Sequence, residues 1–219
     1  MTATCPLNCK SDDRPRSLRD ASLCRQRREM LGLPHIAPLT AYAAHLRGHG
    51  TLVVPDFDPL DGGIAAQALF LFEKPGPMTD ESGECPGSGF ISRNNDDATA
   101  DATFEFMRQA GIPRKLTVIW NLIPWWNGTR KVTARELHQG AECVVELLKL
   151  LPALSAVVMV GRSAGLARPY FATTDLALID SYHPSPMVKA TSREKWEMIP
   201  LQWGRVVTMV ASSLGRDAD

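Results

Sequence analysis

Four short apolar runs, separated by segments with helical patterns, constrain the fold of this chain more than any other feature of its sequence. Each run is apolar throughout rather than alternating, which is the pattern of a strand buried on both faces of a sheet. The runs cover residues 68–72, 116–120, 156–160 and 176–179, and the helical patterns cover 97–109, 133–150, a short stretch after 163, and 192–213. Strands that alternate with helices form right-handed crossovers, so we predict an α/β fold, a three-layer α/β/α sandwich with a four-stranded parallel sheet.

The length of 219 residues and the hydrophobic fraction of 44% are sufficient for one domain with its own core. We expect the polar residues 1–15 to be disordered and residues 16–219 to form a single domain. Two further helices are predicted over 17–30 and 38–47. The first is basic, and we expect a solvated face, or alternatively a DNA contact, for its arginines Arg19, Arg25, Arg27 and Arg28.

The overall charge does not indicate a strongly basic protein, because 24 Lys and Arg residues balance 24 Asp and Glu residues. Local basic patches still matter for partners such as nucleic acid. No apolar run approaches the length of a membrane span, and no secretory signal pattern opens the chain. We therefore expect a soluble monomer of the cytoplasm with no membrane partner.

The cysteines do not form a metal-site pattern. Cys5 and Cys9 resemble half of such a site, but Cys24, Cys85 and Cys143 are scattered singly, and a complete site needs a second half with matching spacing. The number of cysteines, five, is odd, which speaks against a secreted disulfide framework. We therefore predict free cysteines and no metal.

A polar residue follows each predicted strand within four positions: Glu73, Asn121, Ser163 and His183 in chain order. The carboxyl ends of parallel strands lie at one edge of the sheet, which is where ligands of α/β proteins bind. His183 precedes Pro184, and Ser185 precedes Pro186, so both are held in extended conformations. An acid, an amide, a hydroxyl and an imidazole on one rim predict an active site.

A longer series of residues runs along these strand ends: Phe72-Glu73-Lys74-Pro75-Gly76-Pro77, Gly89-Phe90, Asn121 and His183-Pro184-Ser185-Pro186. From about Leu69 to the last helix, this series resembles the motifs of the uracil-DNA glycosylase superfamily. The resemblance implies an enzyme that flips uracil out of DNA and hydrolyses its N-glycosidic bond, releasing free uracil. It implies water as the nucleophile and no cofactor, so we expect no covalent adduct through Lys74.

The resemblance also implies a role for each site residue. Phe90 would stack on the base, with packing in a loop or core as its alternative role. Asn121 would read the edge of uracil with an amide that both donates and accepts, unless it is a turn residue. His183 would hydrogen-bond a uracil carbonyl as the leaving base gains negative charge.

The first motif departs from the family at Phe72, where many branches have glycine, and at Lys74, which cannot be a water-activating carboxylate. Glu73 resembles the acid of the iron–sulfur branch, and we assign it to orient water or stabilise the sugar cation, with an outward-facing ion pair as the alternative. The reserve acids and amide are Asn95, Asp96 and Asp97. The four cluster cysteines of that branch are not reproduced, since Cys143 falls near one ligand position but Trp125 falls near another, and we predict no cluster.

DNA contacts are expected on both sides of His183. Ser163 and Arg162 are expected to hold a phosphate at the start of a short helix. Ser185, Pro186 and Met187 are expected to contact DNA. Pro186 and Met187 are expected to enter the stack as a wedge after the base flips, with packing of Met187 under the last helix as the alternative.

Two other functions fit parts of the sequence. Residues 161–165 match the G-x-S-x-G turn of serine hydrolases, with Ser163, Asp180 and His183 in the expected order, although Asp180 and His183 share one short turn. The departures at Phe72 and Lys74 also allow a non-catalytic module that binds uracil or abasic DNA.

Overall fold

The computed structural model describes residues 12–48, 53–81, 86–172 and 174–214. Its main sheet contains four parallel strands in the order β4-β2-β5-β6, formed by Thr117–Asn121, Ala68–Phe72, Ala156–Val160 and Ala177–Ser181. The predicted parallel sheet is therefore confirmed. Strand β2 is flanked by β4 on one side and by β5 on the other, so the chain reverses direction across the sheet next to the end of β2. A crevice forms at such a switch point.

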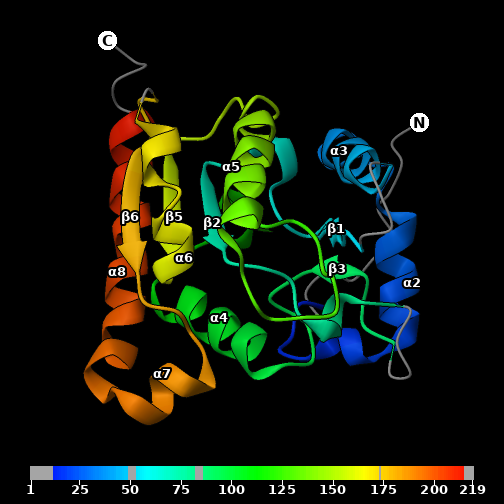
Figure 1. Ribbon diagram of the computed structural model, residues 1–219, viewed down its shortest axis with the longest axis horizontal. Coiled ribbons are helices and arrows are strands. Elements are labelled where there is room, and N and C mark those ends of the chain that lie inside the picture. Colours follow the sequence, from blue (N-terminus) through cyan, green and yellow to red (C-terminus); the bar gives the residue numbers. More distant parts are fainter. Residues whose placement is uncertain (1–11, 49–52, 82–85, 173, 215–219) are drawn as a thin grey trace, which may run out of the picture.

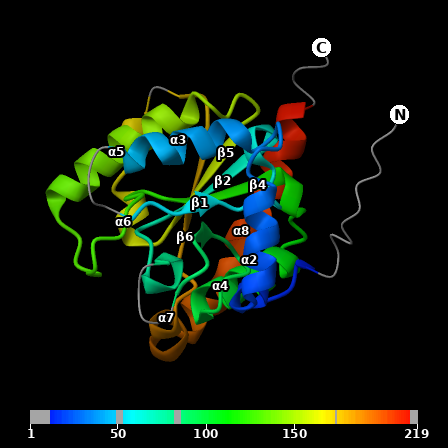
Figure 2. The same ribbon diagram turned by 90° about the vertical axis from the view of Figure 1, so that its right-hand side faces the viewer.

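Helices cover both faces of this sheet (Figures 1 and 2), which gives the predicted three-layer α/β/α sandwich. On one face, Phe70 of β2 meets the edge of Trp203 on α8 (Arg193–Leu214), and Phe106 of α4 (Ala98–Gln109) packs against the same indole. On the other face, Trp120 of β4 stacks on Phe57 with a centroid distance of 3.6 Å. That face is covered by α3 (Ala37–Arg47) and α5 (Ala134–Leu148), and the Tyr42 hydroxyl of α3 donates to the Cys143 carbonyl of α5.

Side-chain caps explain where several helices begin. The Asp97 carboxylate accepts from the backbone N–H groups of Thr99 and Ala100 at the start of α4. Thr133 and Glu136 form a reciprocal capping box at the start of α5. The remaining helices are α2 (Ala21–Glu29), α6 (Arg162–Gly165) and α7 (Pro186–Thr191), with short 3₁₀ turns at Ser17–Arg19, Gly63–Ala65, Pro77–Thr79, Arg114–Leu116 and Arg168–Phe171.

Two elements were not predicted from the sequence. One is a small parallel pair of strands, β1 (Asp56–Phe57) and β3 (Phe90–Ile91). The other is α7, which occupies the segment that we had expected to be a stiff loop. Ser185 caps this helix by accepting from the Val188 N–H, and Pro186 is its first residue, a position that proline favours.

The N-terminal expectations need correction where the structure describes them. Residues 12–15 were expected to be disordered, but Asp13 pairs with Arg93 and Arg114, each at 2.5 Å. Arg27 was expected on a solvated face, but its side chain is buried and pairs with Asp58 at 2.5 Å. The basic pattern of this helix in the sequence does not show that Asp58, from a distant loop, pairs with one of its arginines.

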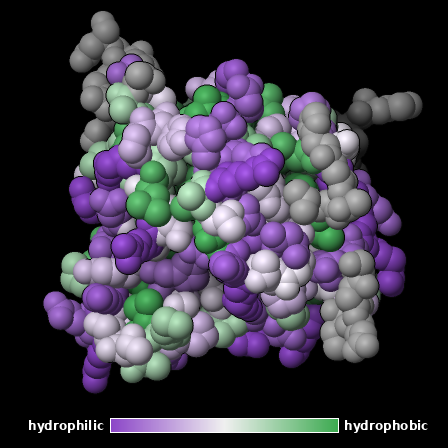
Figure 3. All heavy atoms as spheres, viewed as in Figure 1, coloured by the Kyte–Doolittle hydropathy of each residue, from purple (hydrophilic) through white to green (hydrophobic). Residues whose placement is uncertain are grey.

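On the face shown in Figure 3, hydrophobic residues occur in small groups among hydrophilic ones. Scattered exposed apolar residues of this kind are normal for a protein in water. Among the helices of the described ranges, none combines the length and the apolar character needed to cross a bilayer.

Candidate functional site

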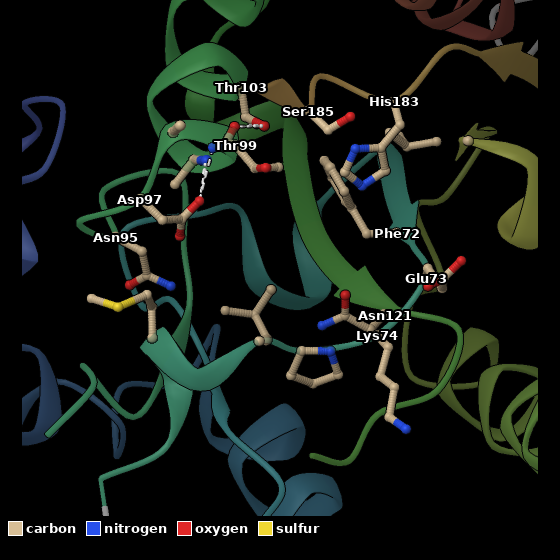
Figure 4. A pocket seen from close by; sticks show the side chains of 18 of the residues that line it. Phe72, Glu73, Lys74, Asn95, Asp97, Thr99, Thr103, Asn121, His183 and Ser185 are labelled. Atoms are coloured by element: carbon tan, nitrogen blue, oxygen red, sulfur yellow. Dashed lines mark hydrogen bonds between the residues drawn. The ribbon is translucent and has the colours of Figure 1, made fainter. Parts of the chain in front are cut away.

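A cavity of about 710 Å³ opens at the carboxyl ends of the sheet strands, next to the switch point at β2. Residues from all four strand ends line it, including Glu73, Asn121, Ser163 and His183. Figure 4 shows several of the lining side chains, with His183 between Asp97 on one side and Glu73 on the other. The predicted convergence of polar strand ends on one site is therefore present in the structure.

Asn121 is the last residue of β4, and it lines the cavity with 4% of its surface exposed. No described residue hydrogen-bonds its side-chain amide. The amide therefore presents both a donor and an acceptor to a ligand in the cavity.

His183 follows β6 and is held by its neighbours. The Phe72 ring meets the imidazole edge-on, with a centroid distance of 5.6 Å and an interplanar angle of 89°. Gly161 leaves room for the ring, since a Cβ at that position would lie 3.2 Å from the Cβ of His183. The Phe72 ring therefore helps to orient the imidazole.

The protonation of His183 follows from its burial, which lowers the pKa of the imidazole below its ordinary value of 6.5, against the opposing charges of Glu73 and Asp97. The imidazole is thus neutral at neutral pH and keeps a single N–H. Its Nδ1 is buried and has no hydrogen-bond partner among the described residues. An uncharged donor at this place suits an oxygen that gains negative charge during a reaction.

Glu73 lines the cavity directly after β2. The Ser163 hydroxyl donates to its Oε2, and no other described residue donates to its carboxylate. The alternative of an outward ion pair with an arginine is not formed. Ser163, expected at a DNA phosphate, instead contacts this acid.

Lys74 lines the cavity through part of its side chain, but its ammonium group is directed away from the other labelled residues in Figure 4. It pairs with Glu136 at 2.7 Å, with 3% of the lysine side chain exposed, and also donates to Asn127. The unusual lysine therefore ties the loop after β2 to the beginning of α5.

The reserve residues have separate roles. Asp97 lines the cavity opposite Glu73 and uses Oδ1 to cap α4. Asp96 pairs with Arg16 at 3.1 Å and does not line the cavity. Asn95 lines the cavity, but its amide is occupied by Ser88 and by the Phe90 carbonyl. Of the two reserve acids, only Asp97 reaches the cavity.

The expected stacking role of Phe90 is wrong in this structure. Its side chain is 1% exposed, packs with Leu18 and Cys24, and does not line the cavity. Its neighbour Ile91 lines the cavity instead. Successive residues of a strand point to opposite sides, and both residues are apolar, so the sequence does not distinguish which of them faces inward.

The expected wedge lies at the rim of the cavity. Met187 is 74% exposed, so it does not pack under the last helix. Pro186 and Ser185 also line the rim, although the Ser185 hydroxyl is engaged as the cap of α7. Arg162 is exposed at the same rim, and no described acid pairs with it.

The serine hydrolase arrangement is not assembled. Ser163 donates to Glu73 rather than to His183, and Asp180 pairs with Arg168 at 2.8 Å. His183 therefore has neither the serine nor the acid that such a triad requires. Gly161 of the G-x-S-x-G segment makes the turn after β5, and the other four residues of the segment form α6.

Of the cysteines, Cys24 and Cys143 are free thiols, while Cys5, Cys9 and Cys85 lie outside the described residues. Within the described ranges, no group of three or more His, Cys, Asp or Glu side chains is arranged to hold a metal ion.

The residues that line the cavity and were missed by sequence reasoning include Ile91, Thr99 and Arg130. Thr99 had one usable signal, because it follows the helix cap Asp97 by two positions and so lies in the first turn of α4. Arg130 had none, because it lies in the loop between β4 and α5 and approaches Gly76 only through the fold.

A comparison with models of known protein families found no match to this sequence, and a comparison with curated proteins also found none.

Proposed function

We propose that the protein is a monofunctional uracil-DNA glycosylase, which hydrolyses the N-glycosidic bond of uracil in DNA and leaves an abasic site. The observation that carries the proposal is the convergence of the free Asn121 amide, the neutral imidazole of His183 and the Glu73 carboxylate on one cavity. Each of these groups matches one requirement of the reaction.

Asn121 supports recognition of the base. Uracil presents a carbonyl acceptor beside an N–H donor, and a side-chain amide complements both at once. Cytosine presents the reverse pattern at the corresponding position, so the same amide discriminates against it. The cavity also lies at the edge of the sheet, where a flipped nucleotide can enter from outside.

His183 and Glu73 support the chemistry. The bond between C1′ of the sugar and N1 of uracil breaks, and its electron pair leaves with the base. The imidazole N–H donates to the uracil oxygen on which this charge develops. A water oxygen then bonds to C1′, and the carboxylate of Glu73 accepts the proton that the water loses.

The proposal includes a monomer that acts on DNA in the cytoplasm. Met187 and Arg162 stand at the rim of the cavity, where an apolar side chain can fill the space left by a flipped base and a guanidinium can meet a phosphate. Phe90 has no part in the proposal, because its ring is buried elsewhere.

Single-turnover incubation with an oligonucleotide that contains one uracil tests the function. We expect abasic sites, detected by alkaline strand cleavage, and no product from the same oligonucleotide with thymine or cytosine. His183→Ala should lower the rate constant by on the order of a hundredfold or more while leaving binding of abasic DNA nearly intact. Tight binding of uracil or abasic DNA without any excision would instead establish the non-catalytic module.

A further inference from the structure

We propose that Ser163 is a positioning residue for Glu73, and that its hydroxyl fixes the direction of the carboxylate that serves the attacking water. This inference rests on the proposed function, because it assigns a role within that reaction. It replaces the DNA-phosphate contact that the sequence led us to expect of Ser163.

The main chain at Glu73 is already fixed by the sheet. The Ile123 N–H donates to the Glu73 carbonyl at 2.9 Å, and the Leu122 N–H donates to the Phe72 carbonyl at 2.7 Å. The next residue, Lys74, is held by its buried pair with Glu136. Residues on both sides of Glu73 are therefore anchored, and only its side chain retains rotational freedom.

Ser163 removes that remaining freedom. A glutamate side chain has several rotatable bonds, and fixing it in one geometry costs entropy that only specific contacts offset. The Ser163 hydroxyl supplies such a contact to Oε2, and Oε1 has no donor among the described residues. One carboxylate oxygen is thus held by the protein, and the other is available to a water molecule.

The position of Ser163 is tied to that of His183. Ser163 lies two residues after Gly161, whose N–H donates to the Ser181 carbonyl at 2.8 Å and whose missing Cβ lets His183 approach. The same turn therefore sets the imidazole on one side and the carboxylate on the other. This explains why Ser163 lies at the cavity although it is not hydrogen-bonded to His183.

A double-mutant cycle tests the inference, with single-turnover uracil excision measured for the wild type, Ser163→Ala, Glu73→Ala and the double variant. We expect Ser163→Ala to reduce the rate constant by about tenfold or more, since it removes a hydrogen bond to a charged group. In the Glu73→Ala background, the same change should have an effect of less than about twofold, because there is no carboxylate to position. Ser163→Thr keeps the hydroxyl and should restore most of the rate.

Ser155→Ala is the matched control, because Ser155 precedes the same strand β5 at its other end and, among the described residues, its hydroxyl bonds only the Gln67 carbonyl. It should leave the rate unchanged. Affinity for abasic DNA and the melting temperature should not change in Ser163→Ala. Equal losses in both backgrounds, or a loss of affinity instead of rate, would overturn the positioning role. Excision by the wild type with full activity of Ser163→Ala refutes this inference alone, whereas no excision by the wild type refutes the proposed function and with it this role.

Discussion

A Cβ placed on Gly161 would lie 3.2 Å from the Cβ and 3.3 Å from the Cδ2 of His183, so the histidine, after one strand, takes up the space that a side chain after the neighbouring strand would need. The φ of Gly161 is also +86°, a conformation that residues with a side chain rarely adopt. The imidazole therefore owes its place in the cavity partly to the absence of a side chain on Gly161, which follows the neighbouring strand β5.

Gly161→Ala should displace His183 and lower uracil excision by on the order of tenfold to a hundredfold, since small misplacements of a reacting group are costly. The melting temperature should also fall, because alanine strains the backbone at this φ. Single-turnover rates normalised to the folded fraction measure the effect. Gly165→Ala is the control, since no atom lies within 4 Å of a Cβ there and its φ is not positive. Equal rates for the two variants would show that the contact does not orient His183.

Asn121→Asp should weaken uracil excision by at least about tenfold, because it replaces the amide donor by an acceptor that faces a uracil carbonyl, and an unpaired buried group costs about 1–3 kcal/mol. The fold should be retained, since the two side chains have the same shape and no described residue hydrogen-bonds the amide. Cleavage of uracil-containing oligonucleotides by this variant checks the prediction. Unchanged activity would remove Asn121 from base recognition.

Met187→Ala should impair excision in duplex DNA by about tenfold and in single strands by less than about twofold, because only a duplex must be parted and then kept from closing. The side chain is 74% exposed at the rim, so the fold should not depend on it. Leu201→Ala is the matched control, since Leu201 is 66% exposed on α8 and does not line the cavity. Equal losses on the two substrates would contradict a role in base flipping.

The contact between Lys74 and Glu136 predicts a dependence of stability on pH. Burial acts to raise the pKa of Glu136, but hydrogen bonds from Lys74 and Thr133 outweigh it and lower the pKa from 4.5 to about 2. A lowered carboxyl pKa contributes stability above the unfolded value, and this contribution is lost as pH falls from about 4.5 toward 2. As the pH falls over this range, the melting temperature should therefore decrease less steeply in Glu136→Gln than in the wild type. Glu146→Gln, in an exposed pair on the same helix, should follow the wild type, and a Glu136→Gln curve parallel to the wild type would contradict the prediction.

The strands and most helices were predictable, because each depends on a pattern within its own segment. The apolar runs at 68–72 and 156–160 became β2 and β5 with the same bounds, and the other two strands shifted by one or two residues. Helix α7 was missed because Ser185-Pro186 was interpreted as a stiff loop, although serine before proline is also a pattern with which a helix begins.

The sequence by itself determined that strand ends would bring Glu73, Asn121, Ser163 and His183 to one edge of a parallel sheet, since the order of strands and helices sets which ends meet. Only the tertiary structure decided what each side chain does there. Phe90 turned into a minor core while Ile91 faced the cavity, Ser163 reached Glu73 instead of His183, and Lys74 reached Glu136, which lies 62 residues away in the chain. Periodicity is a local property that a chain carries in its sequence, whereas the partner of a polar side chain depends on which distant elements pack beside it.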